Sequence, residues 1–343
     1  MRLPQADRAD DCRKETKNDR GPYHECTLQR TPPLVDSVPQ WTQKPRFFAK
    51  GRGSCQLTLI TLDVRCYDSQ VFPSESLSAA DAAVFETFVV PRYLKLFGEL
   101  AVQMFLGMEG ARIAHLGCRT GYPDSELARQ ASGMSLYGVD CSASGLELAR
   151  HKAHAQKYDS LEYVQATDLP APLPAAVFSH VLSLHPFLGV NQRATLLAEM
   201  SRLLYIGGQC LLALPLRGSF QEIGDLFREY ALKTDDGDLS KAVDAMMAAR
   251  PTIESLSDEM ESVGLGDVDV EIRHTQLTFD SGRALLEDPV CRLLVLPDIR
   301  AGLGDVELER PLEYLRDAID KYWSASHFEL TLNVGCASAR RIG

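Results

Sequence analysis

The feature that most constrains the fold of this chain is a regular alternation of apolar runs and helical patterns over residues 111–214. Parallel strands need long connections, and a helix is the usual one, so this order predicts consecutive βα units. Such an alternation is typical of a parallel sheet that helices cover on both faces. We expect five of these strands, at residues 111–116, 135–139, 161–165, 176–184 and 209–214.

The C-terminal part follows a different pattern. Apolar and charged residues alternate over 268–272, and apolar residues alternate again over 328–336, which predicts two half-buried strands that pair with each other. Residues 282–323 between them are mostly helical by pattern, and we expect this insert to help build a substrate pocket. The predicted fold is α/β: a Rossmann-like, doubly wound, seven-stranded sheet with an antiparallel C-terminal strand pair and a helical insert before the last strand.

Three local signals set expectations for individual helices. Pro91 interrupts the helical pattern of residues 78–108, which predicts two consecutive amphipathic helices. The Gly207–Gly208 pair is expected to stop the helix before the fifth strand, because glycine commonly ends helices. Ser219 and Glu222 have the three-residue offset of a capping box at the start of the next helix.

The N-terminal segment differs from the rest of the chain. Up to about residue 50 it is polar and rich in proline and charge, which predicts a poorly structured extension over residues 1–70. The apolar run at 57–64 is long enough for a strand, with no sheet assigned to it. We expect one catalytic domain at 71–343, divided into N-terminal helices (71–110), a cofactor-binding core (111–235) and substrate-side helices with closing strands (236–343).

The composition excludes several classes of protein. A formal net charge of −11 argues against a nucleic-acid binder, which displays basic surfaces to phosphates. The sequence shows neither a secretory signal nor an apolar run as long as a membrane span, so we expect a soluble, cytoplasmic protein with no membrane partner. None of the nine cysteines forms a CxxC pair, and we assign no metal site.

The central functional signal is the loop His115–Gly121, with the sequence HLGCRTG, where the first strand passes into a helix. Glycines at this place let the backbone approach a ligand beyond the carboxyl ends of the strands. Asp140 ends the second strand, where a carboxylate can accept hydrogen bonds from ribose hydroxyls. Arg119 and Tyr122 stand where a dinucleotide fold needs its second and third glycines, and no Walker A loop is present. The loop therefore predicts a nucleotide-like cofactor without a pyrophosphate.

Several motifs in this order resemble those of class I S-adenosylmethionine-dependent methyltransferases. HLGCRTG and YGVD resemble the DLGCGTG and GvD motifs of that family. TDLPAPLPAAVFSHVLSLH and EMSRLLYIGGQCLLALP are similar to the family's stretches around the fourth and fifth strands, so that the resemblance covers about residues 85–341. The helical insert before the last strand is similar to that of malonyl-acyl-carrier-protein and trans-aconitate methyltransferases.

The resemblance implies S-adenosylmethionine as the cofactor and indicates which residues bind each part of it. The glycine loop faces the methionine part, and Ser183, after the fourth strand, lies next to it. Asp140 binds the ribose, Cys141 lies beside the adenine, and Asp168 accepts the exocyclic amine. The full set of implied cofactor-binding residues is His115, Gly117, Cys118, Gly121, Asp140, Cys141, Asp168 and Ser183.

Two residues depart from the family pattern. His115 stands where the family usually has an acid, and Arg119 where it usually has a glycine. Arg119 brings a cation close to a cofactor that is itself a sulfonium cation, and the two repel each other unless Arg119 points away. Weakened or lost cofactor binding is therefore one of the expectations.

Methyl transfer is an in-line displacement at an activated carbon, so the protein mainly aligns the acceptor and excludes water. A carboxylate acceptor needs only positioning, whereas a phenol, amine or carbon acid needs a base, for which His185 is the candidate. The sequence Ser183–Pro186 (SLHP) and the acidic charge favour a small-molecule or carrier-bound acyl substrate. Two alternatives stay open: a catalytically degenerate binding or regulatory module, and a dinucleotide-dependent oxidoreductase.

Overall fold

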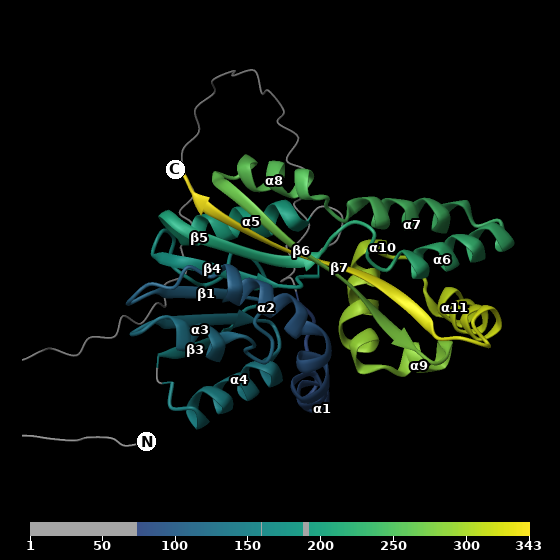
Figure 1. Ribbon diagram of the computed structural model, residues 1–343, viewed down its shortest axis with the longest axis horizontal. Helices are drawn as coiled ribbons and strands as arrows, with labels where there is room; N and C mark the ends of the chain where they lie inside the picture. Colours follow the sequence, from purple (N-terminus) through teal and green to yellow (C-terminus); the bar gives the residue numbers. More distant parts are fainter. Residues whose placement is uncertain (1–73, 159, 188–191) are drawn as a thin grey trace, which may run out of the picture. The chain divides into compact units, whose positions relative to one another are not determined.

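The computed structural model describes residues 74–158, 160–187 and 192–343. The expectations for residues 1–70, including the strand at 57–64, lie outside the described residues. Figure 1 shows a central sheet with helices packed around it and a second group of helices around the extended ends of β6 and β7. Within the described part of the chain, no helix combines the length and apolar character that crossing a membrane requires.

The sheet has seven strands in the order β3-β2-β1-β4-β5-β7-β6. Strands β1 to β5 run parallel, and β7 runs antiparallel to both of its neighbours. The predicted doubly wound sheet with an antiparallel C-terminal pair is thus confirmed. The strands are β1 (Arg112–Leu116), β2 (Ser135–Asp140), β3 (Leu161–Gln165), β4 (Phe178–Leu184), β5 (Leu204–Pro215), β6 (Leu265–Phe279) and β7 (Phe328–Arg341).

The order of the strands fixes where a ligand can bind. The chain moves outward from β1 to β2 and β3, then returns to place β4 on the other side of β1. In open α/β sheets the ligand crevice lies beyond the carboxyl ends of the strands at such a switch point. In this protein the switch point, here called the crevice, lies beyond Leu116 of β1 and Leu184 of β4.

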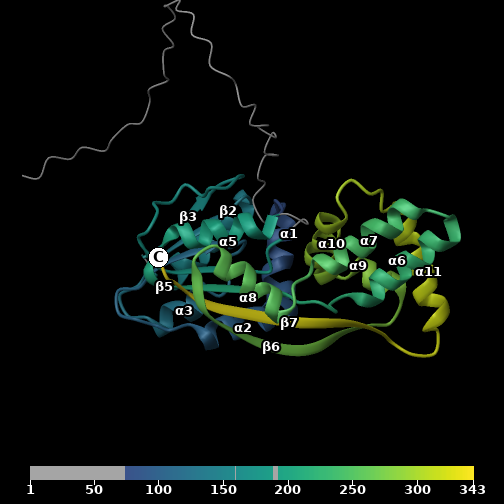
Figure 2. The same cartoon turned by 90° about the horizontal axis from the view of Figure 1, so that it is seen from above.

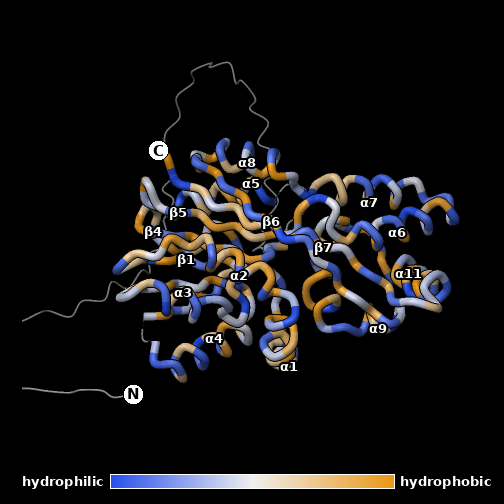
Figure 3. The backbone as a smooth tube through the Cα atoms, viewed as in Figure 1, coloured by the Kyte–Doolittle hydropathy of each residue, from blue (hydrophilic) through white to orange (hydrophobic). Residues whose placement is uncertain are grey.

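Helices cover both faces of the parallel part of the sheet. Leu100 of α2, Leu127 of α3 and Leu146 of α4 belong to one buried cluster, and Leu197 of α5 and Met260 of α8 belong to another. Figure 3 shows the hydrophobic residues concentrated along the central strands β4 and β5, where every residue of β4 is buried. The helices are α2 (Lys95–Met104), α3 (Asp124–Gln130), α4 (Ala143–Ala155), α5 (Gln192–Leu203) and α8 (Ile253–Ser262).

The remaining helices form a lobe beside the far ends of β6 and β7, as Figures 1 and 2 both show. Pairing between these two strands extends from Leu265 and Arg341 to Phe279 and Phe328, well beyond the end of β5. The helical insert predicted at 282–323 is present. The lobe contains α6 (Gln221–Thr234), α7 (Gly237–Ala249), α9 (Gly282–Glu287), a π-helical segment (Cys291–Val295), α10 (Leu296–Leu303) and α11 (Glu309–Tyr322).

The N-terminal helical region corrects one expectation. Pro91 does not separate two helices, because α1 (Ala79–Val84), a π-helical segment (Phe85–Leu94) and α2 follow each other without a break. Proline lacks a backbone N–H and its ring clashes with the carbonyl four residues earlier in an α-helix. The π-helical segment, whose turns are wider than α-helical ones, contains Pro91, and Tyr93 of the same segment is buried.

The expected glycine stop is wrong. Helix α5 ends at Leu203, and β5 already begins at Leu204 and runs through Gly207 and Gly208. Leu204 pairs with Phe178 of β4, and its carbonyl accepts a hydrogen bond from Arg341. Partners on neighbouring strands therefore start the strand before the glycines are reached.

The expected capping box at α6 is also wrong, since α6 begins after Phe220 without a side-chain cap. Ser219 Oγ instead accepts from the Asn333 amide at 2.9 Å, and Glu222 accepts from the Thr331 amide at 3.0 Å. Strand β5 ends at Pro215, so beyond that point β7 has a strand partner only on the β6 side. The two side chains satisfy backbone groups of β7 that would otherwise lack a partner.

Candidate cofactor and acceptor site

The glycine loop has the conformation that its sequence predicts. Gly117 has a φ of 71° and Gly121 a φ of 76°, a region that favours glycine. A Cβ on Gly121 would lie 2.9 Å from the Cβ of Ala149 in α4, so a larger residue does not fit there. Arg119 also has a positive φ, of 47°, which is costly for a residue with a Cβ. The substituted position therefore keeps the backbone shape of the glycine that it replaces.

Asp140 lies at the carboxyl end of β2, as predicted, and is fully buried. Its Oδ2 accepts from the Ser74 hydroxyl at 2.9 Å and from the Arg119 amide at 3.0 Å, and its Oδ1 accepts from the Ser142 amide at 2.8 Å. The segment before α1 is held in place by a further bond, from the Leu77 amide to Ser142 Oγ at 3.0 Å. Asp140, the carboxylate that the resemblance assigns to the ribose, thus accepts its hydrogen bonds from groups of the protein itself.

The side chain of Arg119 stays in the crevice. It is only 2% exposed, and its guanidinium donates to the carbonyls of Leu184 at 2.9 Å and His185 at 2.7 Å. The guanidinium carbon lies 4.8 Å from the ring centre of Phe187 and 5.9 Å from that of Phe85. Burial lowers the pKa of Arg119, while the nearby Asp140 acts to raise it. Arg119 therefore bridges from the loop after β1 to the end of β4.

His115 takes part in a buried network that the sequence did not reveal. Its Nδ1 lies 2.7 Å from Asp124 Oδ1, and the Tyr163 hydroxyl donates to Asp124 Oδ2 at 2.9 Å. Asp124 begins α3 and is fully buried. A carboxylate is thus present near the loop although position 115 holds a histidine. The only signal in the sequence was an acidic residue in the first turn of the helix after the loop.

The other residues that the resemblance assigns to the cofactor differ in their burial. Cys118 is buried in the loop, and Cys141 is half-buried with its Sγ donating to the Ser74 carbonyl at 3.2 Å. Ser183 is buried and donates to the Leu116 carbonyl at 2.9 Å, which joins β4 to β1. Asp168 is exposed and accepts from Thr167 at 2.8 Å. The structure gathers the loop, Asp140 and Cys141, and leaves Asp168 at the surface.

His185 directly follows β4 and is fully buried, with a φ of 46°. Its Nε2 lies 2.9 Å from the Tyr93 hydroxyl, and its Nδ1 has no partner among the described residues. The ring also packs edge-on against Phe97, with centres 5.1 Å apart. Burial lowers the pKa of His185 to about 4, so the imidazole is neutral near pH 7.

This burial predicts a loss of stability in mild acid. Desolvation lowers the pKa of both His185 and His180 to about 4, below the usual 6.5. Between pH 4 and pH 6.5 the unfolded chain therefore binds more protons than the folded chain. The contribution of the two neutral histidines to the free energy of unfolding is complete above pH 6.5 and is lost as the pH falls toward 4. We expect a loss of about 1 to 2 kcal/mol per histidine between pH 7 and pH 5. Urea unfolding at both values measures it, and His185→Asn, which suits a positive φ, should reduce the loss. Equal losses in variant and wild type would contradict this assignment.

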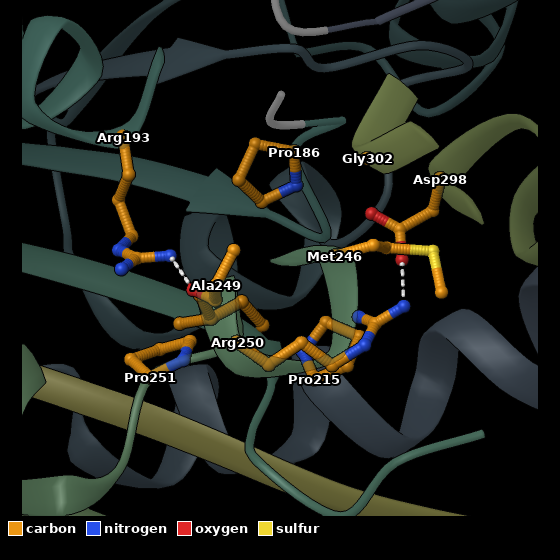
Figure 4. A pocket seen from close by; sticks show the side chains of 10 residues that line it. Pro186, Arg193, Pro215, Met246, Ala249, Arg250, Pro251, Asp298 and Gly302 are labelled. Atoms are coloured by element: carbon orange, nitrogen blue, oxygen red, sulfur yellow. Dashed lines mark hydrogen bonds and ion pairs between the residues drawn. The ribbon is translucent and has the colours of Figure 1, made fainter. Parts of the chain in front are cut away.

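A cleft of about 430 Å³, its open mouth included, begins at Pro186, the residue that follows His185 in the sequence. It is lined by Pro186 after β4, Pro215 at the end of β5, Arg250 after α7 and Asp298 in α10. Figure 4 shows the side chains of Arg250 and Asp298 directed toward each other, and their ion pair measures 2.8 Å. Both are more than nine-tenths buried. Arg250 Nε has no partner among the described residues, so the guanidinium retains a free donor.

The frame of a cofactor site is therefore present, but in this conformation its residues do not fit S-adenosylmethionine. Asp140 and the crevice residues Arg119, Ser183 and His185 are all buried by other parts of the chain. Ser74 takes the hydrogen bond that a ribose hydroxyl requires. Arg119 takes the carbonyls at the end of β4.

Comparison with known proteins finds similarity to one family model and to several solved structures. Residues 114–212 match the family model described as a methyltransferase domain. The YcgJ protein of Bacillus subtilis is 12% identical with a TM-score of 0.48, over 73% of this chain and 100% of its own. A putative methyltransferase from Bacillus halodurans is 17% identical with a TM-score of 0.47, over 72% of this chain and 99% of its own. No match is found among curated proteins.

A third similar structure is a phosphoethanolamine N-methyltransferase from Haemonchus contortus, solved with phosphomonomethylethanolamine and S-adenosylhomocysteine. It is 16% identical with a TM-score of 0.47, over 78% of this chain and 59% of its own. The matched residues run from β1 to β5 and so contain the glycine loop and Asp140. The comparison thus identifies residues 114–212 as similar to a methyltransferase domain.

Proposed function

We propose that this protein methylates a carboxylate on a small molecule or on a carrier-bound acyl group that binds in the cleft that begins at Pro186. The observation that carries the proposal is the buried pair of Arg250 and Asp298 at the carboxyl ends of β4 and β5. This place lies next to the crevice where the cofactor of such a domain binds. The helical lobe supplies both residues, and Asp298 belongs to the insert over residues 282–323 that is expected to help build a substrate pocket.

The chemistry of the cleft favours a carboxylate over other acceptors. Arg250 Nε is buried without a partner among the residues that the structure describes, and a buried donor in this state is costly until an acceptor reaches it. A carboxylate or carbonyl oxygen of the substrate would supply that acceptor. Asp298 compensates the arginine charge, so the cleft suits a single acidic group better than a polyanion.

The state of His185 supports the same choice of acceptor. A phenol, amine or carbon acid needs a base whose pKa lies near the working pH. Burial lowers the pKa of His185 to about 4, which makes it a weak base at pH 7. A carboxylate is already ionised and needs only alignment. We therefore propose His185 as a positioning residue, held by Tyr93, that shapes the inner end of the cleft.

The test is release of S-adenosylhomocysteine from S-adenosylmethionine with matched acceptors: small carboxylic acids, carboxylated acyl thioesters, and their amide counterparts. We expect turnover with a carboxylate and none with its amide. The double variant Arg250→Met with Asp298→Leu removes both charges together and should lower kcat/KM at least 100-fold. Arg228→Met, which removes an exposed ion pair with Asp244, serves as the control and should leave it unchanged. Turnover with amines or phenols alone would overturn the acceptor class.

A second candidate is a binding or regulatory module that keeps the methyltransferase fold without catalysis. The observation that favours it is the hydrogen bonding of Arg119 and Ser74 to the groups that a cofactor needs. Under this candidate, small carboxylates raise the melting temperature through the cleft, whereas no acceptor gives turnover.

A further inference from the structure

We infer that Arg119 is an internal competitor of S-adenosylmethionine, which sets a weak affinity for the cofactor because the side chain must leave the crevice before the cofactor can enter. The inference rests on the proposed function in one respect, that the crevice binds this cofactor. It concerns the strength of binding and the residue that determines it, which neither the fold nor the family model assigns.

The position of the guanidinium carries the first step. Ligands of open α/β sheets bind beyond the carboxyl ends of the strands at the switch point, here between β1 and β4. Arg119 starts from the loop after β1, and its guanidinium donates to Leu184 and His185 at the end of β4. A weaker contact of 3.4 Å reaches the Gly117 carbonyl at the end of β1. The side chain therefore spans the crevice from one side to the other.

The charge of the guanidinium makes the competition exclusive. Carbonyl oxygens and the rings of Phe85 and Phe187 surround it, an environment that stabilises a cation. S-adenosylmethionine brings a cation of its own. Two cations in one buried space repel each other strongly because little water screens them. The arginine and the cofactor cannot share the crevice, so one must leave when the other enters.

Ser74 also opposes cofactor binding, at the neighbouring carboxylate of Asp140. Its hydroxyl donates to Asp140 Oδ2, and its carbonyl accepts from Cys141 Sγ. The Leu77 amide holds the segment to Ser142. A ribose hydroxyl can reach the Asp140 carboxylate only after Ser74 has released it. Arg119 and Ser74 thus oppose binding at two adjoining places, one at the end of β4 and one at the end of β2.

The consequence for affinity follows from population arithmetic. When only a fraction of molecules is open, the apparent dissociation constant equals the intrinsic constant divided by that fraction. Removing the bonds of Arg119 raises the open fraction without touching the contacts that the cofactor makes. A smaller residue at position 119 should therefore tighten binding, and glycine suits the positive φ found there.

Calorimetric titration with S-adenosylmethionine and with S-adenosylhomocysteine tests this inference without any need for a methyl acceptor. We expect Arg119→Gly to lower the dissociation constant at least tenfold and Ser74→Ala to lower it at least threefold. Circular dichroism verifies that each variant is folded. Arg340→Ala is the matched control, because Arg340 also donates to a backbone carbonyl, that of Gly207, outside the crevice, and it should leave the constant unchanged.

The outcomes separate this inference from the proposed function. Tighter binding by both crevice variants, with the control unchanged, supports it. Dissociation constants within threefold of wild type for both variants overturn it and leave the proposed function standing. No binding heat from any of the folded proteins overturns it and also removes S-adenosylmethionine from the proposed function.

Discussion

Replacing Asp298 by alanine is expected to lower the free energy of unfolding by about 3 to 5 kcal/mol. Asp298 and Arg250 form an ion pair of 2.8 Å in which both residues are more than nine-tenths buried. Removing the carboxylate leaves the buried Arg250 guanidinium without its countercharge. The guanidinium carbon lies 4.8 Å from the centre of the Phe220 ring. The desolvation cost of the arginine is then no longer offset. Urea unfolding followed by circular dichroism measures the change.

Two further variants distinguish the loss of a partner from the loss of packing. Arg250→Met with Asp298→Leu removes both charges and keeps side chains of similar size, so it should recover most of the stability that Asp298→Ala loses. Asp244→Ala breaks an exposed ion pair with Arg228 and should change the free energy by no more than about 1 kcal/mol. If Asp298→Ala behaves like Asp244→Ala, the pair is not buried as described, and the acceptor cleft loses its main support.

The sequence predicted those parts of the fold that depend on local pattern. The strand β3 has the predicted bounds, and β1, β2 and β4 differ from their predicted bounds by at most two residues. Each combines a continuous apolar run with a clear stop, and the glycines at 117 and 121 mark a loop whose positive φ values require them. Pattern is informative here because neighbours along the chain decide the conformation.

The errors occur where a distant partner decides. Ser219 and Glu222 match a capping box by spacing, but they bind β7, because that strand extends past the end of β5 and needs hydrogen-bond partners. Leu204 joins β5 ahead of the glycine pair, because β4 offers it a partner. The spacing of residues along the chain does not tell where a distant strand, β7 or β4, will lie. Both errors therefore share one physical cause.

The same limit applies to the site. The sequence located Asp140 and identified Arg119 as a departure, because both lie in the recognisable strand–loop pattern. It could not show that Arg119 turns inward to the end of β4, or that Ser74 approaches Asp140 from 66 residues away. Asp124 was also missed as a site residue, although it pairs with His115 at 2.7 Å. A residue that departs from a motif shows where the site differs from the family pattern. The effect on the site depends on which groups the new side chain contacts.

Asp140→Ala provides the second large expected effect, because the buried carboxylate holds three parts of the crevice together. It accepts from Ser74 Oγ and from the amides of Arg119 and Ser142, so its removal leaves two backbone donors and one hydroxyl without partners. Each unsatisfied buried donor costs about 1 to 3 kcal/mol, and we expect a total loss of about 3 kcal/mol after local relaxation. Thermal and urea unfolding measure the loss.

Asp168→Ala is the matched control for Asp140→Ala, since the two acids receive cofactor roles from the same resemblance but differ completely in burial. Asp168 is exposed and bonds only to Thr167 among the described residues, so its replacement should change stability by less than about 0.5 kcal/mol. A large loss for Asp140→Ala and a negligible one for Asp168→Ala would show that the closed crevice contributes to the stability of the domain. Its opening for a cofactor then has to be driven by the cofactor's own contacts. A negligible loss for both would show instead that Ser74 and the loop do not depend on Asp140, and the competition at the ribose position would have no physical basis.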